Sequence, residues 1–265
     1  MTVQVRHIGA QKSRCPDRRW PGRAAGGDMI ETVQCAGADF CEELSGSGDT
    51  SFTRFYEGDP PSRLIYSTEN LTLLADMSPL VLGHLLLLPS NHYLSFAQVL
   101  SLHAAEVRDL LDGFLPLYRE TFGEPLILEH GSSAGQGSHA CITHAHLHFL
   151  PVDGDAVDAL LVGDSLTYLD LSDLGELTLP PWPSSAYFLR VYREKYRVYR
   201  PTGEQKRQYL RSIVGAVLAI EEPEWDYAVV MRKAALRETM RMVDYWPGKL
   251  DGTVMAADAE AARVR

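Results

Sequence analysis

The sequence has few cysteines, no long hydrophobic run and no excess of basic residues. Its four cysteines, Cys15, Cys35, Cys41 and Cys141, are too few and too irregularly spaced for a secreted disulfide framework. No apolar stretch approaches the roughly 18 residues that a membrane span needs. The formal net charge of -10 argues against a protein that coats nucleic acid through a basic surface. These absences predict a soluble, cytoplasmic protein with neither a membrane nor extended nucleic acid as a partner.

The length of 265 residues and the hydrophobic content of 45% are sufficient for a large core. The composition changes along the chain. The first segment differs from the rest because it is basic, rich in glycine and without apolar periodicity. We predict four parts: a mobile basic arm over residues 1–45, a catalytic core over 46–155, an extension packed on the core over 156–250, and a frayed tail over 251–265.

Apolar periodicity predicts the elements of the core. A short helical turn is expected from Phe40 to Leu44. Strands are expected over residues 63–66, 71–76, 84–89 and 126–130, the first two joined as a hairpin. The most secure helix begins after Ser95, which with Gln98 forms the pattern of a capping box. Its apolar stripe should lie on the sheet, Pro116 should kink it, and Gly123 should end it.

Beyond Pro151 the pattern is less regular. A short helix is expected around residues 156–162 within an otherwise irregular acidic segment. Strands over residues 187–192 and 197–200 follow, and then amphipathic helices over 205–220 and 231–245. With the core, these elements predict an α+β protein.

Three histidines alternate in residues 141–151, which read Cys-Ile-Thr-His-Ala-His-Leu-His-Phe-Leu-Pro. His144, His146 and His148 occupy every second position of a run rich in apolar and β-branched residues, a spacing that places side chains on one face of a strand. The loop over residues 131–139 has three glycines and can bring backbone N–H groups close to an anion.

Several chemistries fit alternating histidines. On a regular strand the outer two are roughly 13 Å apart, so all three do not easily bind one metal ion, although a pair could. They could also be polar residues of a solvated face, but three in alternation beside a glycine-rich loop favour a functional site. Phosphoryl chemistry suits the spacing best, because one imidazole can attack phosphorus while another on the same face protonates the leaving group.

Two blocks of the sequence resemble the histidine triad (HIT) family. The segment His144-Ala-His146-Leu-His148-Phe-Leu matches the pattern His-x-His-x-His followed by two apolar residues. The second block contains Asp76-Met-Ser-Pro79, Gly83-His84 and Pro89-Ser-Asn-His92, and is similar in residue type and spacing to the segment that precedes the triad in that family. The resemblance covers residues 50 to 151.

The resemblance implies a HIT-like antiparallel sheet with a long helix packed on it, and a site for a nucleoside monophosphate unit. His146 would be the nucleophile that forms a covalent nucleotidyl-imidazole intermediate. His148 would contact the phosphate and the leaving group, and His144 with His84 would orient the site.

The substrate-binding residues implied by the resemblance lie mostly in the earlier block. Asp76 would hold the ribose hydroxyls, and apolar residues would sandwich the base. The implied substrate-binding set is Asp76, Ile65, Leu74, Met77, His92, Cys141 and Gln136.

This chain departs from the family pattern near the triad. Cys141 stands where many members have a serine that touches the phosphate, and Ala140 replaces the glutamine commonly found just before that serine. The sequence leaves open whether Gln136, in a longer loop, substitutes for that glutamine. We interpret Cys141 as a small apolar residue rather than a nucleophile. Cys35 and Cys41 do not have the usual spacing of a zinc-binding pair, so we predict neither a metal site nor a cofactor.

The extension resembles larger triad-like proteins only loosely. Arg190, Arg193 and Lys195 could bind a polyphosphate or the non-nucleotide half of a substrate, or could form a solvated strand edge. Compact triad proteins pair their sheets into homodimers, and a homodimer is one expectation for this chain. The alternative is that the extension covers the sheet edge that would form the dimer.

The sequence therefore predicts an enzyme that hydrolyses or transfers a nucleoside 5'-monophosphate group from an ester, phosphoramidate or anhydride through His146. A nucleotide phosphorylase, which uses phosphate as the acceptor, is the second candidate. A nucleotide- or RNA-end-binding protein that uses the extension as a partner surface is the third.

Overall fold

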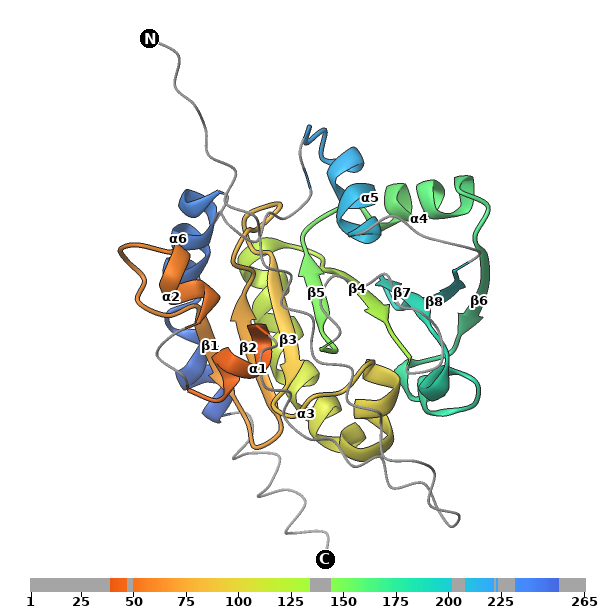
Figure 1. The fold of residues 1–265 in the computed structure, drawn as a ribbon, viewed down its shortest axis with the longest axis horizontal. Helices are drawn as coiled ribbons and strands as arrows, with labels where there is room; N and C mark the ends of the chain where they lie inside the picture. Colours follow the sequence, from red (N-terminus) through yellow and green to blue (C-terminus); the bar gives the residue numbers. More distant parts are fainter. Residues whose placement is uncertain are drawn as a thin grey trace, which may run out of the picture.

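The computed structural model describes residues 39–46, 50–133, 144–201, 208–221, 223 and 232–252. Eight strands in this part of the chain form one antiparallel sheet in the order β1-β2-β3-β5-β4-β7-β8-β6 (Figure 1). The α+β class and the antiparallel sheet agree with the prediction. The strands are β1 (Leu64–Ser67), β2 (Leu71–Ala75), β3 (Leu85–Pro89), β4 (Leu126–Gly131), β5 (Leu147–Leu150), β6 (Thr167–Leu171), β7 (Tyr187–Tyr192) and β8 (Lys195–Arg200).

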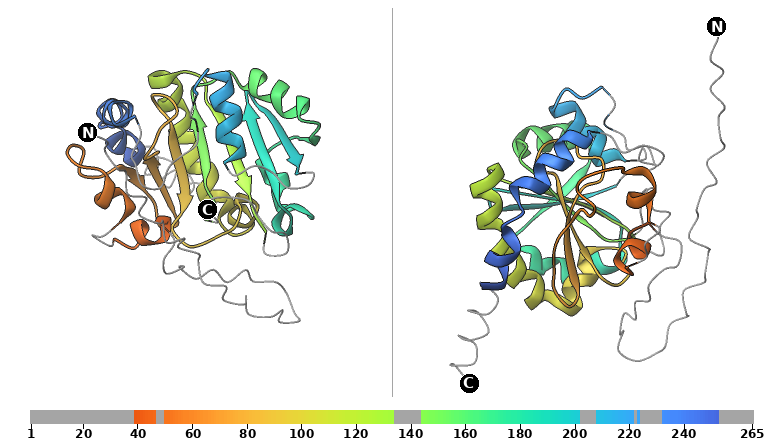
Figure 2. Two further views of the ribbon diagram at one scale, coloured as in Figure 1. Left: turned by 45° about the horizontal axis from the view of Figure 1, so that its top comes forward. Right: turned by 90° about the vertical axis from the view of Figure 1, so that its left-hand side faces the viewer.

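Helices cover both faces of the sheet. The long α3 packs on one face, where it contributes to the largest apolar cluster, and α1 lies on the opposite face (Figure 2). Helices α4 and α5 join α1 on that second face, where they pack over β4, β7 and β8. The helices are α1 (Asp39–Leu44), α2 (Ser51–Phe55), α3 (Phe96–Phe122), α4 (Gly154–Gly163), α5 (Tyr209–Val217) and α6 (Lys233–Met242), with 3-10 turns η1 (Leu174–Thr178) and η2 (Trp182–Ser184). Within the described ranges, no helix is long and apolar enough to cross a membrane.

The first turn of α3 is capped differently from the prediction. Ser95 precedes the helix but makes no side-chain cap bond, so the predicted capping box is wrong. Instead, the carboxylate of Glu129 on β4 accepts hydrogen bonds from the Phe96 N–H (2.6 Å) and the Tyr187 hydroxyl (2.7 Å). The Tyr187 oxygen in turn accepts from the Ala97 N–H (3.1 Å). A long-range cap therefore replaces a local one and ties the helix to two strands.

The irregular point of α3 also differs from the expected one. The backbone at His103 is non-helical (φ −127°, ψ 27°), whereas Pro116 lies inside the helical run. The His103 ring bonds the Tyr93 hydroxyl at 3.0 Å. The predicted end at Gly123 is correct, because Gly123 is the C-cap with a φ of 97°.

The predicted histidine strand is shorter than expected. Only residues 147–150 form β5, so His148 lies in the strand and the other two triad histidines precede it. The Ala145 N–H bonds the Tyr93 carbonyl at 2.7 Å, which holds this segment against the loop before α3 rather than against a neighbouring strand. The three histidines are thus not on one regular strand face.

The C-terminal extension contributes three strands to the same sheet. β7 pairs with β4 along Ile127 to Gly131, and β8 and β6 continue outward. Strand β6 falls in the segment that was predicted to be irregular. Because β7 of the same chain pairs with the outer edge of β4, that edge is not available to a strand of a second chain. A homodimer remains a prediction, and it would need a surface other than the β4 edge.

The end of the described chain returns to the long helix. Trp246 is fully buried and its ring lies 5.6 Å from that of Phe114 and 5.9 Å from that of Phe122, both on α3. The extension therefore completes the core beneath the sheet, in addition to extending it. Residues 1–38 of the predicted arm over residues 1–45, and residues 253–265 of the predicted tail over 251–265, lie outside the described residues.

The Glu129 cap predicts a pH dependence of stability. Burial raises the pKa of Glu129 from 4.5 to about 7, although Tyr187 and the Phe96 N–H partly oppose the rise. Between pH 4.5 and about pH 7, Glu129 is therefore protonated in the folded protein and ionised in the unfolded chain. The contribution of Glu129 to the free energy of unfolding should therefore fall by about 3 kcal/mol as pH rises through this window. Buried histidines with lowered pKa values, such as His84 and His144, contribute in the opposite sense, so the Glu129 contribution is the difference between the natural chain and Glu129→Gln.

Urea unfolding at pH 5 and pH 8 measures this fall. Glu129→Gln should remove it, and Glu120→Gln, on the exposed face of α3, is the matched control. An identical pH dependence in the natural chain and in Glu129→Gln would contradict this account of Glu129.

Candidate active site

The histidine site (His84, His144, His146 and His148) lies on the α1 face of the sheet. His148 pairs across the sheet with Leu86 on β3 and Leu128 on β4. Leu86 belongs to the small apolar cluster under α1, and Leu128 to the cluster under α4 and α5. The site is therefore flanked by two apolar clusters on one face of the sheet, one supplied by α1 and the other by the extension.

His146 has one ring nitrogen fixed by the backbone. Its Nδ1 lies 2.8 Å from the carbonyl oxygen of His144, which can only accept, so Nδ1 carries the proton. Nε2 then keeps a lone pair, and it has no hydrogen bond with the described part of the chain. Burial lowers the pKa of His146, with Arg211 adding to the effect and Asp76 opposing it. A neutral imidazole with an available Nε2 lone pair is the form required of a nucleophile.

Phe40 on α1 forms a wall of the site. Its ring packs edge-on against His146, with centroids 5.4 Å apart, and against His144 at 5.9 Å. The His148 ring lies 4.7 Å from that of His146. Both neighbours restrict the orientation of the His146 imidazole.

His84 and His148 form a chain of defined tautomers. The Leu80 N–H donates to His84 Nδ1 at 3.2 Å, so the proton of neutral His84 is on Nε2. That Nε2 lies 2.9 Å from His148 Nδ1, which therefore accepts. Neutral His148 must then carry its proton on Nε2, as a hydrogen-bond donor on the nitrogen remote from His84.

The pKa values favour these neutral forms. Burial lowers the pKa of His84 to about 4, although the nearby Asp76 carboxylate opposes the effect. Burial, with the neighbouring His146 and His84, also holds the pKa of His148 well below its ordinary value. Both rings are neutral at pH 7, so the two tautomers derived from the hydrogen bonds are the relevant ones.

A glycine places His84. Gly83 has a φ of +79°, and a Cβ at this position would lie 2.6 Å from the Phe122 ring. Its carbonyl accepts from the Tyr118 hydroxyl (2.7 Å), and its N–H bonds Thr239 on α6 (2.9 Å). A side chain at this position would require the Phe122 ring to move and would be strained at this φ.

Asp76 is engaged by the protein itself. Its Oδ1 accepts from the Ser78 N–H at 2.8 Å, and its Oδ2 lies 3.3 Å from Arg211 and 3.7 Å from His84 Nε2. Burial would raise the pKa of Asp76, but His84 and the Arg211 guanidinium outweigh it and hold that pKa below its ordinary value. Asp76 is a buried carboxylate in this structure, and its predicted role as a ribose ligand remains a prediction.

His144, His92 and Cys41 form a separate group beside His146. The Cys41 thiol lies 3.3 Å from His144 Nδ1 and 3.4 Å from His92 Nδ1. His144 Nε2 donates to the Pro89 carbonyl at 2.8 Å, which leaves its Nδ1 as the lone-pair nitrogen. Burial lowers the pKa of His144 to about 3, opposed by that bond to Pro89. His144 thus serves the site through its carbonyl, while its ring faces Cys41.

This group fits a metal ion. One ligand atom from each of the three residues lies within 4.8 Å of the others. In a tetrahedral zinc site the sulfur and nitrogen ligands are about 3.5 Å apart, close to the observed separations. The outer hydrogen bond of His144 is also of the kind that orients metal-binding imidazoles. Cys41, His92 and His144 would hold such an ion, which would join α1 to the histidine segment. Cys35, the other cysteine considered from the sequence, lies outside the described residues.

Asp76, His84 and His148 also bring three potential ligand atoms within 4.8 Å. This second group does not fit a metal ion. The Asp76 oxygen that faces the histidines already pairs with Arg211, and the Leu80 N–H leaves the proton of His84 on the nitrogen that would have to bind the metal. It is better described as a hydrogen-bonded chain.

The apolar residues expected at the base are not gathered in one cluster. Leu74 packs with Phe40 near the histidines, whereas Ile65 and Met77 belong to the main cluster. All three are buried. Cys141 and Gln136 themselves lie outside the described residues, so their roles stay predictions.

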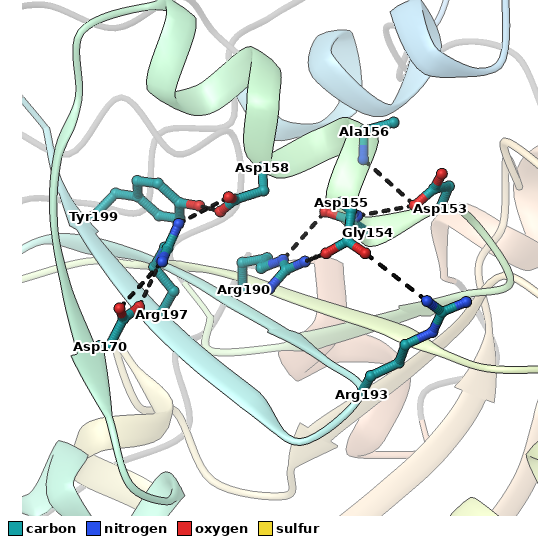
Figure 3. A network of polar contacts seen from close by, with 10 residues as sticks. All are labelled: Asp153, Gly154, Asp155, Ala156, Asp158, Asp170, Arg190, Arg193, Arg197 and Tyr199. Carbon is teal, nitrogen blue, oxygen red and sulfur yellow. Dashed lines mark hydrogen bonds and ion pairs between the residues drawn. The ribbon is translucent and has the colours of Figure 1, made fainter.

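The arginines considered as polyphosphate ligands are paired with acidic groups. Arg190 is buried and bonds the Gly154 carbonyl and the Asp155 carboxylate, and Arg193 lies 3.9 Å from the same carboxylate (Figure 3). Leu128 on β4 pairs with His148 on one side and with Arg190 on the other, so Arg190 lies two strands from His148 on the same face of the sheet. Helix α4 covers Arg190. These contacts agree better with a structural role.

Two residues of the site were missed from the sequence. Phe40 was assigned only to a helical turn, and Arg211 to an amphipathic helix in the extension. The Arg211 contact joins residues 135 positions apart, and no local pattern signals it. For Phe40 the signal was its position beside Cys41, a cysteine already considered as a metal ligand.

Comparisons with known proteins agree with the sequence resemblance. No protein-family model matches the chain. Over 100 residues the chain is 25% identical to the curated Protein hit of Bacillus subtilis (strain 168), a match that spans 38% of this chain and 68% of that protein.

Similar solved structures are histidine triad proteins. One is a hypothetical histidine triad nucleotide-binding protein from Sulfolobus tokodaii (21% identity, 42% of this chain, 66% of that chain, TM-score 0.31). Another is a zinc-bound histidine triad family protein from Mycobacterium smegmatis (24% identity, 42% of this chain, 72% of that chain, TM-score 0.31). The matches cover about two thirds of these relatives. These relatives carry the names Hit or histidine triad, the family that the sequence resembles, and the activity of this chain is proposed from its own site.

The Cys41 group predicts metal binding. Titration with Co(II) should give about one bound ion per chain and a sulfur-to-cobalt charge-transfer band. Cys41→Ser should lose the band, whereas Cys15→Ser, which removes a thiol elsewhere in the sequence, should keep it. The same band in Cys41→Ser, or no binding to the natural chain, would contradict this assignment.

Proposed function

We propose that this protein is an enzyme that transfers a nucleoside monophosphate group from its substrate to water through a covalent intermediate on His146. The observation that carries the proposal is the hydrogen bond from His146 Nδ1 to the His144 carbonyl. It leaves a neutral Nε2 lone pair on a partly exposed ring, beside a second histidine that offers an N–H. The nucleotide part of the proposal rests on the resemblance of the two sequence blocks to the histidine triad family.

In the first step, the His146 Nε2 lone pair forms a bond to phosphorus. The bond between phosphorus and the leaving atom breaks, and its electron pair stays on the leaving atom. The positive charge that develops on the His146 ring is supported by the Nδ1–H bond to the His144 carbonyl. His148 Nε2–H donates a hydrogen bond to the leaving atom, which departs with its negative charge and takes a proton from solvent if it is basic.

In the second step, a water oxygen bonds to phosphorus and releases a proton to solvent. The bond between phosphorus and Nε2 breaks, and its electron pair returns to His146. The free nucleoside monophosphate leaves, and the imidazole is again neutral with its proton on Nδ1. The buried His84 and the Leu80 N–H keep His148 in the same tautomer throughout, so no group of the protein needs to change its net charge between turnovers.

Covalent chemistry at His146 predicts a mass change. Brief mixing with adenylylated, guanylylated, cytidylylated and uridylylated compounds should add one nucleotide to the intact natural chain. His146→Ala should show neither the adduct nor turnover, since its only loss is a partly exposed ring. His103→Ala, which removes an imidazole from α3, is the matched control.

Loss of the adduct in both variants, or turnover by His146→Ala, would contradict the role of His146. Release of a nucleoside diphosphate in place of a monophosphate when inorganic phosphate is present would indicate phosphorolysis.

The donor role of His148 predicts a dependence on the leaving group. His148→Ala should lower kcat/KM by about 10- to 100-fold for an alkyl ester of a nucleoside monophosphate, because a basic leaving atom needs the hydrogen bond most. The 4-nitrophenyl ester, whose leaving group is weakly basic, should lose much less. Equal losses on the two esters would show that His148 does not act on the leaving atom.

A further inference from the structure

Arg211 brings the extension into contact with the histidine site. It lies on α5, far from the triad in the sequence, and its side chain is 12% exposed. All three guanidinium nitrogens have partners: NH1 lies 3.3 Å from Asp76 Oδ2, NH2 donates to the Ser78 carbonyl (2.6 Å), and Nε donates to the Pro223 carbonyl (3.2 Å). The α5 helix is held in place by Tyr209, Leu210, Ile213 and Val214, which pack in the cluster over β4 and β7.

The pairing with Arg211 affects how Asp76 acts on His84. Asp76 Oδ2 is 3.7 Å from His84 Nε2, whereas His148 Nδ1 is 2.9 Å from the same nitrogen. A buried carboxylate without a counter-ion would compete strongly for the His84 proton. Because Arg211 neutralises and holds Asp76, the proton of His84 is directed to His148 instead.

The geometry points to Arg211 as a positioning residue for the reaction, an inference that rests on the proposed function. Through Asp76 and His84, Arg211 keeps His148 Nδ1 occupied as an acceptor. The Nε2–H of His148 is then the only proton that the ring can present to the leaving atom. The C-terminal extension would thus be part of the catalytic apparatus, since it supplies the guanidinium that pairs with Asp76.

Direct binding of the phosphate by Arg211 is a different role. It would require guanidinium nitrogens directed toward the substrate, but each nitrogen already bonds a carboxylate or a carbonyl, and the side chain is largely buried. A phosphate ligand would mainly change KM. A positioning residue would change kcat in a way that depends on the leaving group.

The test compares two variants of the full-length chain. Arg211→Gln removes the cation from Asp76. Arg197→Gln is the matched control, because Arg197 is also an arginine of the extension on the same face of the sheet. Its ion pairs are with Asp158 and Asp170 (Figure 3).

Arg211→Gln should lower kcat by about tenfold or more for the alkyl ester and by less than about threefold for the 4-nitrophenyl ester, with KM nearly unchanged. Arg197→Gln should leave both rates unchanged. Arg211→Lys, which restores the charge next to Asp76, should recover part of the lost rate. Equal losses on both esters, or a rise in KM alone, would overturn the inference.

A double-mutant cycle separates positioning from loss of structure. In a His148→Ala background, Arg211→Gln should no longer change the ratio of the two rates, because the group on which it acts is absent. An undiminished effect on the ratio in that background would overturn the inference.

A measurement without substrate makes the test independent of turnover. Nitrogen-15 NMR of the imidazoles at pH 7 should show His148 protonated on Nε2 alone in the natural chain. In Arg211→Gln the two tautomers of His148 should mix, whereas Arg197→Gln should retain one. An unchanged His148 spectrum in Arg211→Gln would overturn the inference even if the enzyme is active. The predicted change in an inactive protein would support the role of Arg211 and contradict only the proposed function.

Discussion

The hydrogen bond between His146 Nδ1 and the His144 carbonyl is the interaction on which the site depends. It determines which nitrogen of His146 carries the proton and which keeps its lone pair. The bond is available because β5 begins only at Leu147, so the His144 carbonyl is outside the regular strand pairing. A strand that included all three histidines would have used that carbonyl in the sheet. The late start of β5 therefore makes the His144 carbonyl available to His146.

The other imidazoles are oriented by the same means, a fixed donor or acceptor at one nitrogen. The Leu80 N–H acts on His84, His84 on His148, and the Pro89 carbonyl on His144. The loop between β2 and β3 provides the first of these groups, and Gly83 allows that loop to pack against α3. In water each of these four neutral imidazoles would exist as two tautomers. Here each is held in one tautomer by its hydrogen bond. Two of them, His146 and His148, are partly exposed, whereas His84 and His144 are buried.

The extension serves the site both as scaffold and as a source of charge. Strand β7 covers the edge of β4, Trp246 closes the core under α3, and α5 delivers Arg211 to Asp76. A protein that consisted of the triad-containing half alone would lack all three contributions. The extension therefore shares one sheet with the core and also supplies helices α4 and α5 to one face of that sheet.

Much of the fold could be predicted from the sequence, because it depends on local periodicity. The apolar stripe of α3, the hairpin of β1 and β2 and the pattern of β7 all have short-range signals. The alternation of His144, His146 and His148 likewise indicated the candidate site. The cap of α3 by Glu129 was missed, since its partners are 33 and 58 residues away. The Cys41 group and Arg211 were missed for the same reason: their partners are distant in sequence and meet only in the folded chain.

The stereochemistry at phosphorus tests the central claim most directly. A nucleoside phosphorothioate ester of one configuration would be hydrolysed in water enriched in oxygen-18, and the configuration of the product determined. Two successive displacements, the first by His146 and the second by water, predict net retention. Net inversion would mean that water attacks the substrate directly, and would contradict a covalent intermediate on His146.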